Sequence, residues 1–171
     1  MKNLRFIGLG VALALVESAL ERVLPLEYLM PDLVLAFVLY MGLAGFNAAR
    51  GAALAFVVGY FVDALQPGSP ICLNMFVLVS IFLLSRLLTA RLLLAGMVFH
   101  VALALVGSVA SSLIIMGLRA IFERHVGGLE PTVVIVVTRA GATAVAAPFV
   151  FALARRLETK RVARREERLA V

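Results

Sequence analysis

The chain has 171 residues, of which 63% are hydrophobic and 15% are charged, and its mean hydropathy is +1.07. A soluble domain contains about 45–50% apolar residues, so this composition excludes an ordinary soluble protein and predicts an integral membrane protein. Lys and Arg collect on the cytoplasmic side of membrane proteins. The net charge of +6 is therefore interpreted as a signal for membrane orientation and for contact with lipid, and not for nucleic-acid binding.

Charges and turn residues divide the chain into six apolar segments, whose lengths approach the ~20 residues that a helix needs to cross the bilayer. The segments are 4–24, 31–48, 51–65, 71–88, 92–118 and 132–153. The second is short for a full crossing and opens with Pro31-Asp32, which suits a helix N-terminus because the acid lies against the positive end of the helix dipole. Pro148 predicts a kink near the end of the last segment.

Small residues recur at every fourth position of the third segment: Gly51, Ala55 and Gly59. The next step of this series is Asp63, on the same helix face, where a neighbouring helix could approach closely. Two prolines and a glycine at residues 66–70 predict a tight turn. Asn74, at the start of the returning helix, is therefore expected at the depth of Asp63.

The distribution of Lys and Arg predicts the orientation. If both termini are cytoplasmic, 12 of the 16 basic residues lie inside and three lie outside, with Arg139 within a helix. This bias is a strong topological signal. The sequence thus predicts an all-α integral membrane bundle of six transmembrane helices at residues 1–154, with both termini cytoplasmic, followed by a basic cytoplasmic tail at residues 155–171.

In this topology, four polar residues fall in one layer of the outer leaflet: Glu17, Asp63, Asn74 and Arg139. A charge in hydrocarbon costs on the order of 2.5–3.5 kcal/mol on insertion scales, so such residues usually pair or face a cavity. We expect Arg139 to be the central cation, neutralised by Glu17, Asp63 or both, with Asn74 completing the hydrogen bonds. Such a layer either holds the helices together or binds a ligand or partner.

Faces of small residues predict close helix packing, either within the protein or against the single helix of a partner. The residues assigned to partner packing are Gly51, Ala55, Gly59, Gly107 and Ser111. Gly10, Ala14 and Ser18 form a similar face on the first segment.

The tail contains seven basic and three acidic residues and is predicted to continue the sixth helix. Its basic side chains could bind anionic lipid or a cytoplasmic protein, or serve only as a topology signal. The residues concerned are Arg155, Arg156, Lys160, Arg161, Arg164 and Arg165.

Signals for enzymes are absent from the sequence, which has no metal-ligand cluster, no Ser-His-Asp arrangement and no glycine-rich phosphate loop. No catalytic residue, metal or cofactor is therefore predicted. Cys72 is expected to pack as a small apolar residue, His100 to form a hydrogen bond between helices, and His125 to lie in a solvated loop.

Several short motifs together resemble the MreD family of bacterial rod-shape proteins. They are Pro31-Asp32, Arg50-Gly51, Gly59 followed by Asp63, the Pro/Gly turn, and Leu73-Asn74. Length, six-segment hydropathy and the basic tail are similar too, although recognisable motifs are confined to residues 31–78. Ile71-Cys72 and Glu17 depart from the family pattern.

The resemblance implies a non-enzymatic scaffold of the inner-membrane machinery for cell elongation and peptidoglycan synthesis. Its expected partners are MreC, through the transmembrane helix of that protein, and then RodZ, MreB, RodA and a class B penicillin-binding protein.

The family is also thought to share the six-helix fold of the S components of energy-coupling-factor vitamin transporters, which supplies the alternative function. In that reading, the outer polar layer is a ligand pocket. A scaffold fits better, because the loops are short and no aromatic cluster offers a ligand cage. A proton-coupled carrier using Glu17 and Asp63 is disfavoured, because few acids lie in the membrane.

Overall fold

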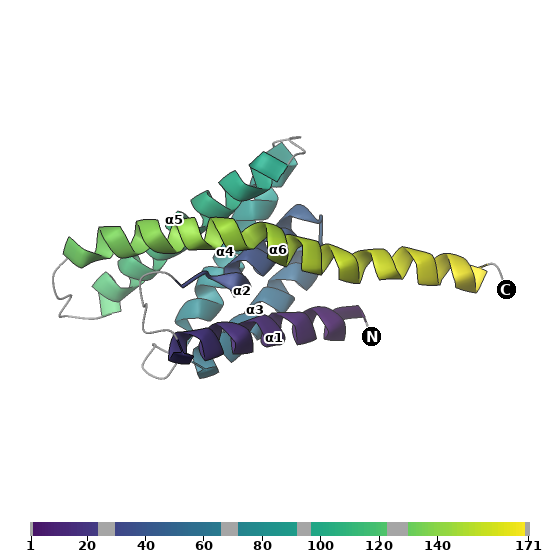
Figure 1. The fold of residues 1–171 in the computed structure, drawn as a ribbon, viewed down its shortest axis with the longest axis horizontal. Coiled ribbons are helices and arrows are strands. Elements are labelled where there is room, and N and C mark those ends of the chain that lie inside the picture. Colours follow the sequence, from purple (N-terminus) through teal and green to yellow (C-terminus); the bar gives the residue numbers. More distant parts are fainter. Residues whose placement is uncertain (1, 24–29, 66–71, 92–96, 123–129, 170–171) are drawn as a thin grey trace.

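The computed structural model describes residues 2–23, 30–65, 72–91, 97–122 and 130–169, which form six helices and no strand (Figure 1). The helices are α1 (Lys2–Val23), α2 (Leu33–Leu43), α3 (Ala48–Leu65), α4 (Leu73–Arg91), α5 (Met97–Phe122) and α6 (Glu130–Leu169). The predicted all-α architecture is confirmed. The turn predicted at residues 66–70, and His125, lie outside the described residues.

Three of the described helices contain a stretch long and apolar enough to cross a membrane: 48–65 in α3, 101–118 in α5 and 136–156 in α6. Helices α2 and α4 are apolar but shorter. Large apolar side chains such as Phe76, Val106 and Val137 are exposed on the outside of the bundle. The protein therefore has several helices suited to a bilayer and an outer surface suited to lipid.

Helix α2 is the centre of the bundle. Residues 34–42 are all buried, and each of the other five helices packs against α2. A helix that is apolar on every face is buried, either in a protein core or in a membrane. At 1.5 Å per residue its 11 residues span about 16 Å, roughly half of the hydrocarbon core.

The end of α2 differs from the sequence prediction. A single segment was expected over residues 31–48, but the helix ends at Leu43. Gly45 follows with φ +70°, a left-handed conformation that favours glycine and stops the helix. The side chain of Asn47 then accepts a hydrogen bond from the Ala49 N–H at 3.1 Å, which starts α3.

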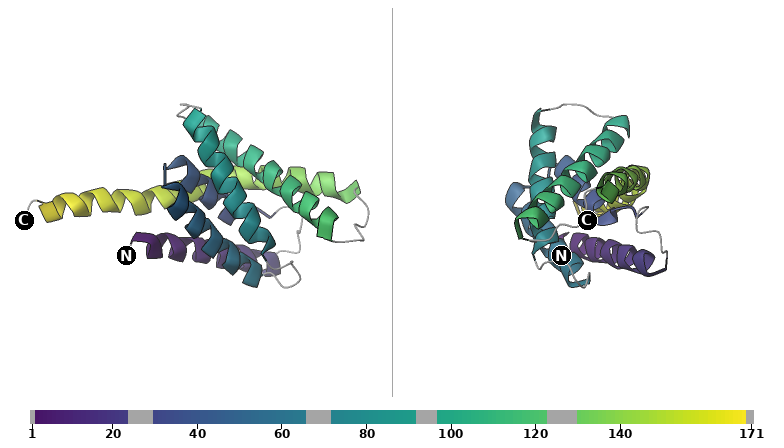
Figure 2. Two further views of the ribbon diagram at one scale, coloured as in Figure 1. Left: turned by 180° about the vertical axis from the view of Figure 1, so that it is seen from behind. Right: turned by 90° about the vertical axis from the view of Figure 1, so that its left-hand side faces the viewer.

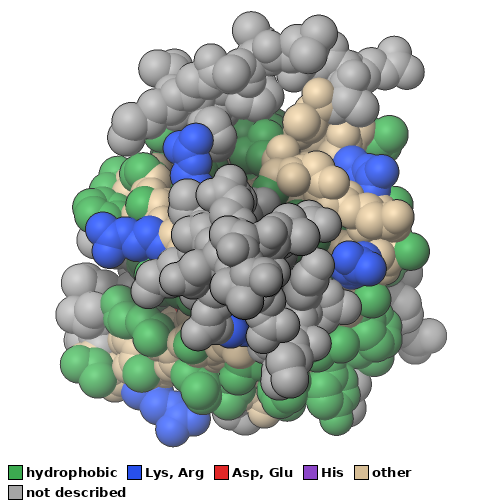
Figure 3. Space-filling view, turned by 90° about the vertical axis from the view of Figure 1, so that its right-hand side faces the viewer, with side chains coloured by type: hydrophobic (Ala, Val, Ile, Leu, Met, Phe, Trp, Pro, Cys, Tyr) green, Lys and Arg blue, Asp and Glu red, His purple; other side chains and the backbone are tan. Residues whose placement is uncertain are grey.

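The first turn of α1 and the last turn of α6 lie on the same side of the molecule (Figures 1 and 2). Contacts at this end join distant segments. The Phe6 ring packs edge-on against Phe46 at 5.0 Å, and Arg86 Nη1 donates to the Phe46 carbonyl at 2.9 Å. Figure 3 looks onto this end and shows Lys and Arg among the described side chains, with no Asp or Glu in view. We call it the basic end.

Helix α6 continues past Pro148 to Leu169 and projects beyond the other helices at the basic end (Figure 2). The predicted helical continuation of the sixth segment into the tail is therefore confirmed. Of the tail residues, Arg155 and Arg156 have exposed side chains. The side chains of Lys160, Arg161, Arg164 and Arg165, like that of His100, are outside those that the structure describes.

Candidate functional site

The start of α2 is closed by two carboxylates from different parts of the chain. Asp32 is the N-cap residue, and its Oδ1 accepts a hydrogen bond from the Leu35 N–H at 2.9 Å. Glu17, on α1, accepts one from the Val34 N–H at 3.3 Å. The first N–H groups of a helix have no partner within the helix, and these acids satisfy two of them. The predicted role of Asp32 at a helix N-terminus is confirmed.

Helix α6 completes the same site. The Asp32 N–H donates to Thr143 Oγ1 at 3.0 Å, and the Thr143 hydroxyl donates to the Arg139 carbonyl at 2.8 Å. Arg139 also has its positive charge near Glu17 and Asp32. Glu17 is only 8% exposed and Thr143 is fully buried. We call Glu17, Asp32, Arg139 and Thr143 the α2 cap site; it joins α1, α2 and α6.

A second site closes the start of α4. The Asp63 carboxylate reaches across from α3, where Oδ1 accepts from the Asn74 N–H at 3.1 Å and Oδ2 from the Met75 N–H at 3.2 Å. Cys72 precedes the helix, and its carbonyl accepts from the Phe76 N–H. The cysteine side chain has no oxygen with which to cap the N–H groups of Asn74 and Met75, so Asp63 acts in its place. We call Asp63, Cys72, Asn74 and Met75 the α4 cap site.

Close packing of α3 on α4 makes this reach possible. A Cβ atom at Gly59 would lie 2.6 Å from the Cα of Met75, closer than real Cβ atoms approach backbone. Only glycine therefore allows the two helices to approach this far, one turn before Asp63.

The predicted polar layer thus divides into two sites. Arg139 has its charge near Glu17 and Asp32 at the start of α2. Asp63, by contrast, accepts hydrogen bonds from the start of α4 and not from Arg139. Asn74 is held at the α4 cap site through its backbone N–H. Helix α3 packs on α1, α2 and α4, whereas α6 packs on α2 and α5. Asp63 and Arg139, which were predicted at the same depth in the membrane, therefore lie on different sides of α2.

Asp32 and Thr143 were not among the predicted site residues. The Pro31-Asp32 pair predicted that Asp32 lies at a helix N-terminus. Thr143 lies four residues after Arg139, on the same helix face, but nothing in the sequence connects that face to Asp32.

The small residues assigned to a partner helix are instead occupied within the chain, so that assignment is corrected. A Cβ atom at Gly51 would meet the Phe82 ring of α4, and one at Gly107 would lie 2.8 Å from Leu39 of α2. Gly59 meets α4, and Ala55 and Ser111 are buried. Of the two readings that the sequence left open, contact within the protein is the one observed.

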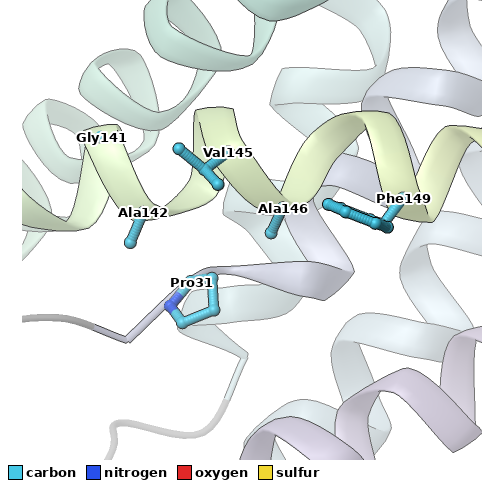
Figure 4. A pocket seen from close by; sticks show the side chains of 6 residues that line it. All are labelled: Pro31, Gly141, Ala142, Val145, Ala146 and Phe149. Carbon is cyan, nitrogen blue, oxygen red and sulfur yellow. The ribbon is translucent and has the colours of Figure 1, made fainter.

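An apolar groove of about 470 Å³ lies beside the α2 cap site, between Pro31 and the outer face of α6 (Figure 4). Its lining from α6 consists of Gly141, Ala142, Val145, Ala146 and Phe149. In Figure 4 the Pro31 ring lies opposite Ala142 and Ala146. The sequence analysis did not single out these residues, although their spacing places them on neighbouring positions of one helix face.

Among the described residues, no group of three or more His, Cys, Asp or Glu side chains is arranged to hold a metal ion. No family model, no curated protein and no solved structure matches the chain.

Proposed function

We propose that the chain is a non-enzymatic, multi-pass scaffold of the bacterial inner membrane, with both ends cytoplasmic, that binds the transmembrane helix of a partner. The motifs at residues 31–78 support a member of the MreD type, for which the partner is MreC. RodZ, MreB, RodA and a class B penicillin-binding protein are then its expected neighbours, and anionic lipid meets its cytoplasmic face. The separation of a basic end from the two acidic cap sites supports this orientation.

One observation carries the proposal: the acids inside the bundle close helix N-termini. Glu17, Asp32 and Asp63 all accept hydrogen bonds from backbone N–H groups. Their oxygens are directed at the protein's own backbone, so they stabilise the arrangement of helices. This use favours a rigid scaffold over the alternatives, an S component with an outer polar pocket and a proton-coupled carrier.

We place the partner helix on the outer face of the α3–α4 hairpin. The internal faces of small residues are already filled, so a partner must pack on exposed apolar surface. Phe56, Tyr60 and Phe76 are large, exposed aromatic side chains of this hairpin, and exposed aromatic residues are frequent anchors of interfaces. The hairpin also belongs to the stretch that carries the family motifs.

Mass spectrometry of the proteins that co-purify with a tagged, gently extracted copy tests this proposal. The wild-type chain should recover a single-pass coiled-coil protein together with a glycosyltransferase or transpeptidase. The double variant Phe56→Ala/Tyr60→Ala should lose at least tenfold of the coiled-coil protein. The matched control Val106→Ala/Leu113→Ala removes similarly exposed side chains from α5 and should recover it normally.

Recovery of paired ATPases with a coupling membrane subunit, or of a bound vitamin, would instead assign the chain to a transporter. Equal recovery of the coiled-coil protein by both double variants would show that the α3–α4 hairpin is not the binding face.

A further inference from the structure

The groove between Pro31 and α6 has room for hydrocarbon. Its volume of about 470 Å³ falls within the ~300–1,000 Å³ of typical ligand pockets. Val145 and Phe149 are 71% and 75% exposed, and a Cβ atom at Gly141 would meet nothing within 4 Å. The groove is apolar and lies in the middle of the 136–156 span of α6, so a guest must be apolar where it fills the groove.

An exposed arginine follows on the same face of α6. Arg156 comes seven residues after Phe149 and eleven after Val145, and both steps return to nearly the same side of a helix with 3.6 residues per turn. The arginine is exposed and lies toward the basic end, where Figure 3 shows no acidic side chain among the residues that are coloured by type. One helix face therefore combines an apolar groove with a cation.

We infer that this face binds an anionic phospholipid of the cytoplasmic leaflet, with its phosphate on Arg156 and an acyl chain in the groove. The eleven residues from Arg156 to Val145 span about 16 Å of helix, and half of the hydrocarbon core is about 15 Å thick. A chain that hangs from a phosphate at Arg156 therefore reaches the groove. The inference rests on the proposed membrane location, and it adds a specific lipid site to it.

Charge distinguishes the lipid from other occupants. A second copy packed here in the same orientation would bring two Arg156 side chains and two basic tails together. A partner's transmembrane helix usually carries Lys or Arg at its cytoplasmic end, which would also face Arg156. The phosphate of an anionic lipid is the complementary group.

Native mass spectrometry of the purified full chain tests the headgroup contact. The chain is titrated in detergent with phosphatidylglycerol and, separately, with phosphatidylcholine carrying the same acyl chains. We expect preferential retention of phosphatidylglycerol and a roughly fivefold weaker binding for Arg156→Gln, the change that corresponds to about 1 kcal/mol per basic residue. Arg50→Gln, which removes another exposed arginine near the basic end, should leave the binding unchanged.

Two groove variants test the acyl-chain contact. Val145→Phe and Gly141→Leu both fill the groove from exposed positions, and both should weaken binding of phosphatidylglycerol. Their matched controls, Val137→Phe on α6 and Gly117→Leu on α5, change equally open positions and should bind normally. Glycerol phosphate without acyl chains should not compete.

Several outcomes would overturn the inference. They are equal binding of the two lipids, equal effects of Arg156→Gln and Arg50→Gln, normal binding by both groove variants, and competition by glycerol phosphate. A dimer that is retained by the wild type and lost with Val145→Phe would assign the groove to a second copy. Because this assay uses the purified chain alone, its failure leaves the partner proposal standing, and loss of partner capture leaves the lipid site standing.

Discussion

The N-termini of α2 and α4 are closed in different ways. At the start of α2, three helices contribute: Asp32 caps its own helix, Glu17 comes from α1, and Arg139 and Thr143 come from α6. At the start of α4, a single carboxylate from the preceding helix accepts from two N–H groups.

The difference lies in sequence distance. Asp63 bonds groups 11 and 12 residues away, whereas Asp32 and Thr143 are 111 residues apart. The α4 cap site therefore stabilises one hairpin, and the α2 cap site fixes how α1 and α6 are arranged around the central helix. Substitutions at the two sites should differ accordingly.

Removing the cation of the α2 cap site has the largest expected effect. Arg139→Gln removes the positive charge near Glu17 and Asp32 and leaves them as two like charges at the start of α2; the loss of an opposite charge nearby is expected to cost about 2–4 kcal/mol. Thermal unfolding of the detergent-purified protein measures this loss. Adding Glu17→Gln should restore part of the stability, whereas adding Asp63→Asn should not. If Asp63→Asn restored the stability of Arg139→Gln and Glu17→Gln did not, Asp63 would be the partner of Arg139 and the two cap sites would be one.

Widening the gap between α3 and α4 should break the α4 cap site. Gly59→Ala places a methyl group against the Met75 backbone, so the helices must separate at a cost of about 1–3 kcal/mol. Gly8→Ala is the control, because its Cβ meets nothing within 4 Å, and it should preserve or slightly raise the stability. The same unfolding assay compares them, and equal effects would contradict the close approach of α3 to α4.

Removing the Asp63 carboxylate should destabilise the start of α4 without affecting the start of α2. Asp63→Ala removes both acceptors and is expected to cost about 1–2 kcal/mol, and Asp63→Asn, which keeps one acceptor oxygen, should cost less. Hydrogen exchange should quicken at the amides of Asn74 and Met75 but not at those of Val34 and Leu35. Faster exchange at all four amides would show that the sites are not independent.

The smallest effect is a gain. Cys72 has φ +78°, a conformation that costs a non-glycine residue about 1–2 kcal/mol. Cys72→Gly should therefore raise the unfolding free energy by about 1 kcal/mol, whereas Cys72→Ala, which keeps the Cβ atom, should not. A similar gain from both variants would assign the effect to the loss of the thiol.

The sequence predicts local features of this protein well. The start of α2 at Pro31-Asp32, the all-α architecture and the continuation of α6 into the tail all follow from neighbouring residues. The early end of α2 at Leu43 was predictable in principle from Gly45 and Asn47, which are turn residues, but the apolar run that surrounds them masked it.

Lateral arrangement could not be predicted in the same way. Hydropathy and charge predict the depth of a residue in the membrane, and on that basis Glu17 and Asp63 were both predicted as partners of Arg139. Which of them faces Arg139 depends on the order of helices around α2, and no residue in the sequence encodes that order by itself. The groove was missed for the same reason, since Pro31 and Val145 meet only through the packing of α2 on α6.

The 111 residues between Asp32 and Thr143 also set a delay between the synthesis of these two residues. Ribosomes add about 5–20 residues per second, so roughly 5–20 seconds separate the synthesis of the two partners. For nearly all of that interval Glu17 and Asp32 have been made and Arg139 has not. Until α6 arrives, the two acids have the N–H groups of α2 as hydrogen-bond partners but lack the positive charge of Arg139. The sixth helix thus allows the second one to become buried in the interior of the bundle.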